Sequence, residues 1–502
     1  MHLAFVATRS QAGLSAPPIT VEVHLSHGLP AFQVVGLSES STREIRSRVR
    51  SAIISSHLKW PDFNITVNLA PTAQRKHGAR YDLPIALGLL VASKQLPREC
   101  VTNREFFGEL GLDGSLRSFP GALSAVLAAT QSGHCCGVAR DRADKLAVIE
   151  NSRLIAAPDL LTLCGLLKTP SPPLATPEET RDAAQSSTTS LAQLRGQPLL
   201  ARALELAAAG GHHLMMIGPP GVGKTLGASA LSGLLPQPHR SVLQELQLLH
   251  DIAGSSPPTG PAFRAPHHSS SVAALLGGTA QALPGEISMA HGGVLFLDEL
   301  AEFPRAVLNQ LRQPLESGEI CISRAEHQHR YPARFQLVAA MNPCPCGQAG
   351  GEEARCRCTP DAIRRYRHSV SGPLMDRIDL HITLSRVAPE HLLSPATQGS
   401  HSADIKNRIH VARERQLSRQ GELNRDLSGD DLLRACALSK AAQTWFVNAI
   451  ETLKLSARSA HRRLRVGRTL ADLEGCEAVS TAHLQTALSF RETSAIADAA
   501  GA

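Results

Sequence analysis

Aromatic residues are scarce in this chain of 502 residues, where they make up 3% of the composition. Proteins that bind single-stranded nucleic acid by base stacking line their grooves with aromatic side chains, so the composition argues against such a surface. The chain also lacks an apolar run close to the ~20 residues of a membrane span, and Ile85–Ala92 is among the longest runs. Its opening, MHLAFVATRS, has no basic segment followed by a long apolar one. We therefore expect neither a signal peptide nor a membrane segment.

Cysteine is present in an odd number, 11, and four of these residues crowd between Cys344 and Cys358. That distribution fits a reducing compartment better than a disulfide framework, and it predicts a cytoplasmic location. Neither sign of charge dominates: the chain has 51 Lys and Arg residues and 44 Asp and Glu residues, for a net charge of +7. This mild basic bias is compatible with a polyanionic partner but does not identify one. The composition excludes secreted, membrane, fibrous and disordered proteins.

The length predicts about three domains. Residues 168–190 hold four prolines and many Ser and Thr residues, which is typical of an extended linker. Before the linker, residues 1–167 mix alternating and helical patterns, so we predict an α/β or α+β domain. Its expected strands are Ile19–Leu25 and Asn64–Leu69, its expected helices are Glu39–Ser56, Leu83–Ser93 and one that ends at Val126–Thr130, and a β-like stretch opens at Val148.

After the linker, short continuous apolar runs predict strands that are buried on both faces, as in a mostly parallel sheet. Residues 191–400 are therefore expected to form an α/β core, and residues 401–502 a small helical domain. The expected strands are His213–Ile217, Val294–Leu297 and Phe335–Ala340, and the expected helices are Leu199–Ala209, Ile405–Arg419, Gly429–Ala437, Lys440–Thr452, Ser456–Glu474 and Thr481–Phe490.

The segment GPPGVGKT fills every required position of a phosphate-binding loop between an apolar strand and an apolar helix. Its glycines let successive N–H groups point at phosphate oxygens, and the helix N-terminus adds partial positive charge. Lys224 is expected to reach the β and γ phosphates of ATP, and Thr225 to ligate Mg²⁺. The predicted nucleotide-binding residues are Gly218, Pro219, Pro220, Gly221, Val222, Gly223, Lys224 and Thr225.

Two further strands end in polar side chains. Asp298 and Glu299 follow the apolar run Val294–Leu297, and carboxylates at that end of a parallel strand lie where α/β sheets bind ligands. Asp298 is expected to hold Mg²⁺ through water, and Glu299 to orient or polarise the attacking water. Asn342 ends the next run and could contact the γ-phosphate or the water. The alternative is a buried asparagine whose amide is satisfied by the backbone of a turn.

Several distinctive blocks of sequence follow one another along the chain. They are GPPGVGKT, FRAPHHSSS (Phe263–Ser271), PGEISMAHGGVLFLDEL (Pro284–Leu300), AAMNPCPCG (Ala339–Gly347), SGPLMDRIDLH (Ser371–His381) and LSARSAHRRLRVGRTLADL (Leu455–Leu473). Together these blocks resemble the ComM/YifB proteins, which are AAA+ ATPases similar to the magnesium chelatase I subunit. The resemblance covers essentially the whole chain.

The resemblance implies a ring, expected to be a hexamer, with ATP bound between subunits. Asn342 then corresponds to the first sensor. Arg377 is the favoured arginine finger and acts in trans, while Arg458 matches the second sensor and reaches the ATP in cis from a helical lid. A finger guanidinium neutralises charge that grows on the transferred phosphoryl group. The rival finger candidates are Arg364, Arg365 and Arg367.

The resemblance also implies DNA as a partner, single-stranded or branched, because ComM-type proteins act in natural transformation as helicases that drive branch migration. Residues Glu319–Phe335 predict a β-hairpin of the kind that lines the pore of ring translocases, where cations track phosphates. A solvated charged hairpin is the alternative reading. The cations expected around its tip are Arg324, His327, His329, Arg330 and Arg334.

Cys344, Cys346, Cys356 and Cys358 form the pattern C-x-C-x9-C-x-C with glycines between the pairs. Four thiolates suit a tetrahedral Zn²⁺ in a structural site. The C-x-C spacing is shorter than usual for zinc, so unligated thiols remain the alternative.

Two segments before the linker resemble those that carry the nucleophile and the lysine of Lon-type proteases, which implies an S5-like fold. They are Lys76–Leu90 and Gly108–Ala129. Arg80 and Leu123 occupy the two catalytic positions, and neither side chain can act as nucleophile or base. We expect a non-proteolytic domain with a DNA-contacting or ring-forming role. Its basic residues are Arg43, Arg46, Arg48, Arg50, Arg75, Lys76 and Arg80. For Arg43, Arg46, Arg48 and Arg50, a solvated helix face is an equally good interpretation.

The favoured function is an ATP-driven DNA motor of the branch-migrating type that serves transformation and recombination. The alternative is a chelatase-like remodeller that acts on a protein or a metal-insertion partner. Both share every ATPase residue, so these motifs do not separate them.

Overall fold

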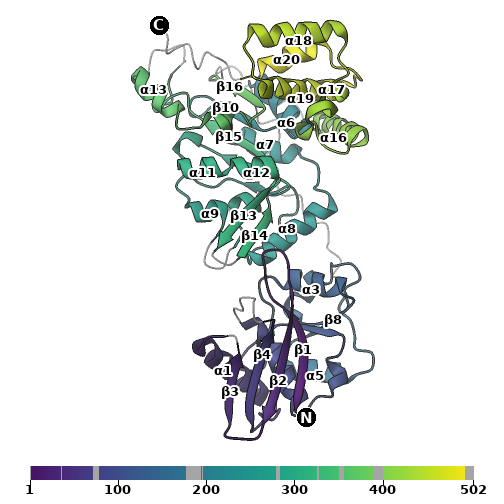
Figure 1. The fold of residues 1–502 in the computed structure, drawn as a ribbon. Helices are drawn as coiled ribbons and strands as arrows, with labels where there is room; N and C mark the ends of the chain where they lie inside the picture. The colour runs from purple at the N-terminus through teal and green to yellow at the C-terminus, as the bar shows by residue number, and fades with distance from the viewer. Residues whose placement is uncertain are drawn as a thin grey trace. The chain divides into compact units, whose positions relative to one another are not determined.

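The computed structural model describes residues 2–35, 37–71, 79–176, 194, 196–278, 283–324, 327–349, 356–387 and 400–491. Two compact units are formed, and Figure 1 shows their elements along the chain. The first unit takes Met1–Ala183 and Gln247–Pro257, and the second takes Ala184–Leu246 and Pro258–Ala502. Two of the basic residues named above, Arg75 and Lys76, lie outside the described residues.

A seven-stranded mixed sheet organises the first unit. Strands β1 and β2 pair antiparallel, as do β2 and β4, while the β3–β4, β1–β5, β5–β8 and β8–β9 pairs are parallel. Alternate residues of β2 are buried, as the sequence pattern predicts for a half-buried strand. In sheet order the strands are β3 (Ala31–Val35), β4 (Asn64–Ala70), β2 (Pro18–Ser26), β1 (Leu3–Arg9), β5 (Arg104–Phe107), β8 (Cys135–Ala139) and β9 (Leu154–Ala157).

Helix α2 (Asp82–Ala92) is buried over its whole length against this sheet, because its residues are apolar on every side apart from Asp82. The β-like stretch expected to open at Val148 is wrong at its start, since Val148 lies in a turn and the strand begins at Leu154. The remaining elements are α1 (Glu39–Ser55), α3 (Ala122–Gln131), α4 (Ala143–Leu146), α5 (Leu160–Lys168) and the small hairpin of β6 (Glu109–Leu110) and β7 (Leu116–Arg117).

The second unit is built on a five-stranded parallel sheet. Its strand order is β11-β12-β15-β10-β16, so β15 lies between the strand that precedes the phosphate loop and the strand that ends in two acids. All four pairings are parallel, which brings the carboxyl ends of the strands to one edge. The strands are β10 (Leu214–Ile217), β11 (Phe263–Arg264), β12 (Val294–Leu297), β15 (Gln336–Met341) and β16 (Leu380–Thr383).

Helices and one antiparallel hairpin surround this sheet. The hairpin, β13 (Glu319–Arg324) with β14 (His327–Pro332), lies within the segment predicted from sequence. Helix α8 (Arg240–Ile252) begins in this unit, and its residues from Gln247 onward belong to the first unit. The other helices that precede the C-terminal region are α6 (Pro198–Gly210), α7 (Lys224–Leu234), α9 (Val272–Leu276), α10 (Glu286–Met289), α11 (Arg305–Gln310), α12 (Arg312–Ser317), α13 (Pro360–Arg367) and α14 (Gly372–Met375).

The C-terminal region is helical, as predicted, and Figure 1 shows its helices gathered together. Ile409 and Leu470 from this region share one apolar core with Met216 of β10 and Val338 of β15. The region therefore packs within the same compact unit as the sheet. No helix among the described residues is long and apolar enough to cross a membrane. The C-terminal helices are α16 (Ser400–Gln420), α17 (Gly429–Cys436), α18 (Lys440–Thr452), α19 (Ala457–Glu474) and α20 (Thr481–Ser489).

Candidate nucleotide site

The phosphate loop leaves β10 at Gly218 and enters α7 at Lys224. Gly221 and Gly223 have φ angles of +82° and +91°, a region that residues with a Cβ rarely adopt, which explains the glycines. Lys224 Nζ donates hydrogen bonds to the carbonyl oxygen of Gly218 at 2.6 Å and to Asn342 Oδ1 at 2.8 Å. Burial lowers the pKa of Lys224, while Asp298 and Glu299 oppose that shift. The ammonium group is thus held at the centre of the loop.

The acids after β12 complete this edge of the sheet. Thr225 Oγ1 donates a hydrogen bond of 3.2 Å to Asp298 Oδ2, so the two predicted Mg²⁺ ligands are neighbours. A hydroxyl beside a carboxylate is a donor set that suits Mg²⁺. Glu299 has a φ of +52°, which is uncommon for a residue with a side chain and typical of functional sites.

Glu299 has a neighbour that the sequence argument did not single out. His268 Nδ1 lies 3.2 Å from Glu299 Oε2, and the His268 ring packs on that of His267 with centroids 4.1 Å apart. The block FRAPHHSSS was noticed for its resemblance alone. The structure shows that this block reaches the acid expected to activate water.

The strand order explains why distant motifs meet. Ile217 of β10 is in register with Met341 of β15, and Leu297 of β12 is in register with Ala339 of the same strand. Each strand is followed by its polar residues, so Lys224, Asp298 and Asn342 lie at one edge. The structure therefore brings together the predicted residues of the phosphate loop, the acidic pair and the first sensor.

The two remaining predicted arginines lie elsewhere in the same unit. Arg377 and Arg458 both donate through Nη2 to Glu316 Oε1, the latter at 3.0 Å. Ser456 caps α19 by accepting the N–H of Ser459, which places Arg458 in the first turn of that helix. Among the described residues, neither arginine is hydrogen bonded to the phosphate loop or to Asn342.

The rival finger candidates on α13 also have local partners. Arg364 Nη2 donates to Asp361 Oδ1 at 2.5 Å, and Arg367 Nε donates to the carbonyl oxygen of Pro343 at 3.4 Å. Arg365 Nε donates to the backbone oxygen of Asp361 at 3.5 Å. These contacts give no preference for any of the three over Arg377.

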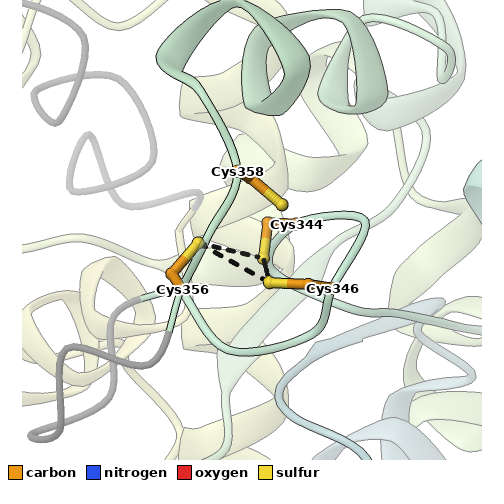
Figure 2. A group of neighbouring side chains, drawn as sticks. All are labelled: Cys344, Cys346, Cys356 and Cys358. Atoms are coloured by element: carbon orange, nitrogen blue, oxygen red, sulfur yellow. Dashed lines mark hydrogen bonds between the residues drawn. The ribbon is translucent and has the colours of Figure 1, made fainter.

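The four predicted cysteines form a cluster, and Figure 2 shows their side chains turned toward a common centre. All four Sγ atoms lie within 4.8 Å of one another. Hydrogen bonds from backbone N–H groups, first that of Gln348, lower the pKa of Cys346 to about 6. The neighbouring thiols of Cys346 and Cys344 raise the pKa of Cys356 and of Cys358. The set of four converging thiols, rather than the pKa of one of them, is what suits a soft cation. We call Cys344, Cys346, Cys356 and Cys358 the four-cysteine cluster.

The loop that carries the first two cysteines packs against the phosphate loop. Gly347 has a φ of +77°, and a Cβ placed on it would lie 2.8 Å from Pro220 Cδ. That Cβ would also lie 3.9 Å from Cγ of Asn342. The backbone at Gly347 thus approaches the nucleotide loop as closely as a glycine allows.

One cation that was expected at the tip of the β13–β14 hairpin lies elsewhere. The pairing ends with Arg324 opposite His327, whose side chains lie outside the described residues. Arg334 is not at the tip: it follows β14 at the base of the hairpin, where its N–H donates to His291 Nδ1. The sequence predicted the hairpin, but it could not show that the strand pairing stops at Pro332. Arg330 is exposed on β14, and His329 is half-buried beside it.

In the first unit, the two positions that resemble the Lon catalytic pair hold no catalytic chemistry. Arg80 lies over the ring of Phe119 with its Cζ 4.8 Å from the centroid, and burial lowers its pKa. Leu123 is buried, and its backbone N–H donates to Asp251 Oδ2 at 2.8 Å. Arg48 is engaged as well, since its Nε donates to buried Asp82 at 2.7 Å. Of the four arginines on α1, Arg43, Arg46 and Arg50 are exposed.

A parallel sheet of this order, a phosphate loop after β10, two acids after β12 and a polar sensor after β15 define an AAA+ ATPase core. Three family descriptions match the chain: "Magnesium chelatase, subunit ChlI" over residues 190–392, "Subunit ChlI of Mg-chelatase" over residues 21–138, and "Magnesium chelatase, subunit ChlI C-terminal" over residues 399–491. The matches fall on both units.

Relatives of nearly full length give the finer assignment. The chain is 44% identical over 495 residues to the YifB protein of Escherichia coli (strain K12), covering 98% of this chain and 97% of the relative. It is 42% identical over 504 residues to competence protein ComM of Haemophilus influenzae (strain Rd), with 98% of each chain covered. Similarity to Lon protease 2 of Bacillus subtilis is partial: 27% over 168 residues, or 29% of this chain and 30% of that protein. The chain belongs to the ComM/YifB family of magnesium-chelatase-like AAA+ proteins.

Proposed function

We propose that this protein is an ATP-driven DNA motor that works as a ring, expected to be hexameric, in the cytoplasm. Its reaction is branch migration or unwinding of DNA during recombination, including the integration of incoming DNA in natural transformation. The observation that carries the proposal is an assembled ATPase edge in a chain that resembles a competence protein over nearly its whole length.

For the ATPase reaction, we assign the phosphates to the backbone of residues 218–225 and to Lys224. Thr225 and Asp298 would hold Mg²⁺, which neutralises phosphate charge when bound. Glu299 would accept a proton from the attacking water, and His268 would fix its carboxylate. Asn342 Oδ1 accepts a hydrogen bond from Lys224 in this structure, which leaves the amide NH₂ to orient the γ-phosphate or the water.

We assign the arginine finger to Arg377, acting on the ATP of the adjacent copy. Because Arg458 donates to the same carboxylate as Arg377, the two guanidinium groups are neighbours at one surface. We propose that Arg458 also acts in trans, whereas the family resemblance implied a cis role. Guanidinium groups suit this task since their fixed N–H forks match phosphate oxygens.

For DNA, the hairpin of β13 and β14 supplies exposed Arg330, and the exposed arginines of α1 supply a second basic surface. Contacts of this type bind the phosphate backbone without reading sequence, so affinity is expected to fall steeply with salt. The scarcity of aromatic residues agrees with backbone binding rather than base stacking.

The four-cysteine cluster is proposed to hold one structural Zn²⁺. Four thiols with Sγ atoms within 4.8 Å match the number and type of ligands of closed zinc sites. A second group, Glu474, Cys476 and His483, is a poorer site. There His483 Nδ1 accepts the N–H of Ser480, so the proton resides on Nε2, which points at Glu474. That ring nitrogen is therefore not free to ligate a metal.

The test is ATP-dependent processing of a labelled four-way DNA junction by the purified protein. We expect branch migration that requires ATP hydrolysis, with Glu299→Gln as the inactive control. DNA is also expected to stimulate ATP hydrolysis. An active ATPase that neither responds to DNA nor moves the junction would overturn the proposed DNA motor. That result would favour the alternative, a chelatase-like remodeller that acts on a protein or a metal-insertion partner. The ChlI family matches also support this alternative.

A further inference from the structure

Glu316 lies at the meeting point of three separate segments of the second unit. It belongs to the last turn of α12, and its Oε1 accepts hydrogen bonds from Arg377, 61 residues further on, and from Arg458, 142 residues further on. Arg377 follows α14, and Arg458 begins α19. One carboxylate oxygen thus gathers the two arginines that the sequence assigns to ATP hydrolysis.

The electrostatics of this group depend on Glu316. Two guanidinium groups that end on one oxygen atom repel each other, and the carboxylate between them offsets that repulsion. Their hydrogen bonds, first that of Arg458 and then that of Arg377, lower the pKa of Glu316. The carboxylate therefore stays ionised, and the group keeps one net positive charge at the surface.

The three side chains differ in how firmly they are held. The Arg377 side chain is 12% exposed, and its Nη1 also donates to the carbonyl oxygen of Pro373 at 2.5 Å. Glu316 and Arg458 are 52% and 50% exposed. The Nε of Arg377 is buried without a hydrogen bond in the part of the chain that the structure describes. Among the described residues, the Arg377 guanidinium is therefore held through its two Nη groups, which contact Pro373 and Glu316.

We propose that Glu316 is a positioning residue that presents Arg377 and Arg458 together to the ATP bound by an adjacent copy of this chain. The inference rests on the proposed trans role of Arg377. Carboxylate and phosphate oxygens accept the same guanidinium N–H groups, so an incoming γ-phosphate competes with Glu316 for both arginines. Glu316 therefore keeps the two guanidinium groups side by side, so that both can also donate to the γ-phosphate of the adjacent copy's ATP.

Glu316 is joined to the base of the β13–β14 hairpin by a short stretch of backbone. Gly318 ends α12 two residues after Glu316, with a φ of +70°, and β13 begins at the next residue. The carbonyl oxygen of Gly318 accepts the N–H of Ala333 at 2.7 Å, and a Cβ on Gly318 would lie 2.8 Å from Cγ of Arg334. The base of the hairpin is thus built on the turn that carries Glu316. The inference is that ATP in one subunit is reported to the DNA-contacting hairpin of its neighbour through this carboxylate.

The first test is the substitution Glu316→Gln, which keeps the shape of the side chain and removes its charge. We expect kcat for ATP to fall by about 10- to 100-fold, because reacting groups that are misplaced by about 1 Å lose that much, while KM stays within about twofold. Asp431→Asn is the matched control, since Asp431 pairs with Arg434 on the exposed face of α17, away from this group. Equal kcat in both variants would overturn the inference.

A second measurement separates positioning from folding. Mixing Glu316→Gln subunits with Lys224→Ala subunits should restore hydrolysis, since the latter still present their arginines to an intact phosphate loop. A defect of folding in the Gln subunit would not be restored. Arg377→Ala, measured in parallel, distinguishes the finger role of Arg377 from the positioning role of Glu316. Normal ATP hydrolysis by Arg377→Ala would overturn the finger role. An inactive Arg377→Ala beside a normal Glu316→Gln would overturn only the role of Glu316.

The coupling is tested by the ratio of ATPase rates with and without single-stranded DNA. Glu316→Gln is expected to lose this stimulation as well as kcat, because the reporting carboxylate is gone. An unchanged ratio at lowered kcat would overturn the coupling to the hairpin and leave the positioning role.

Discussion

Nζ of Lys224 donates a 2.8 Å hydrogen bond to Oδ1 of Asn342, a residue 118 positions away. The bond joins the start of the helix after β10 to the end of β15, and it exists because those two strands are neighbours in the parallel sheet. It fixes the orientation of the Asn342 amide. Under the proposed function, the lysine would organise the sensor residue as well as the phosphates of ATP.

This relationship separates two substitutions at the same site. Lys224→Ala should lower ATP affinity by about 10- to 100-fold, because charge-assisted hydrogen bonds to phosphate are lost. Glu299→Gln should bind ATP normally and lower kcat by at least about 100-fold, since only the proton acceptor is removed. Binding of a fluorescent ATP analogue and steady-state phosphate release measure the two effects. Wild-type turnover in the Gln variant would show that Glu299 does not activate water.

The finger assignment predicts a rescue by mixing. Arg377→Ala should retain ATP binding and lose about 10³-fold in hydrolysis, as expected for a finger. Adding Lys224→Ala subunits should restore part of the activity, because mixed rings contain interfaces that pair an intact phosphate loop with an intact finger. Phosphate release across a series of mixing ratios is the measurement.

Co-purification of two affinity tags must show that the subunits exchange. If they do and every mixture stays inactive, Arg377 does not act in trans, and Arg364, Arg365 and Arg367 become the next candidates.

The four-cysteine cluster predicts about one Zn²⁺ per chain, as in closed structural sites. Metal analysis of the purified protein should find it, and the double substitution of Cys344 and Cys346 by Ser should remove it. Cys476→Ser is the control and should keep the metal, because the second group of candidate ligands is not expected to bind. A metal-free protein that is folded and active would exclude the zinc site.

The contact between Gly347 and Pro220 predicts an effect of the cysteine loop on nucleotide binding. Gly347→Ala should destabilise the protein by about 1–2 kcal/mol, the cost of a Cβ at positive φ, and should also raise KM for ATP. Gly421→Ala is the control, with a φ of +78° and no atom within 4 Å of the added Cβ. It should lose similar stability in thermal unfolding and keep its KM. Equal KM values in the two variants would show that the contact does not shape the phosphate loop.

The Lon-like positions predict the absence of proteolysis. Arg80 and Leu123 cannot supply a nucleophile and a base, so the purified protein with ATP should release no acid-soluble fragments from labelled casein. A Lon protease assayed under the same conditions provides the positive control. Cleavage by the unmodified chain would mean that other residues form a proteolytic site.

The local elements of the fold were predictable where one physical signal dominated. The strand Val294–Leu297 has the predicted bounds because its run of buried apolar residues begins and ends sharply. The helix Lys440–Thr452 has them because its helical periodicity does the same. The phosphate loop was found from spacing alone, since the geometry of phosphate binding dictates its residues. Asp298 and Asn342 followed because each ends an apolar strand.

Relations between distant segments were not predictable from a single sequence. Glu316 carries no local signal, because an acid near a helix end is common, and its role appears only when α14 and α19 are folded beside it. Arg334 was misplaced because pairing partners, rather than charge, determine where a hairpin ends. Contacts of this kind depend on the strand order and the packing of the helices.

Gln247–Pro257 lies in the middle of the ATPase sequence but belongs to the first compact unit. Leu248 is buried in that unit's core with Phe119, and Asp251 accepts the N–H of Leu123 at the start of α3. Cutting the chain at the linker would remove Leu248 from the core of the N-terminal fragment. The C-terminal fragment would carry Leu248 exposed and Asp251 without the N–H of Leu123. We therefore expect that neither unit folds fully when it is expressed as a fragment cut at the linker.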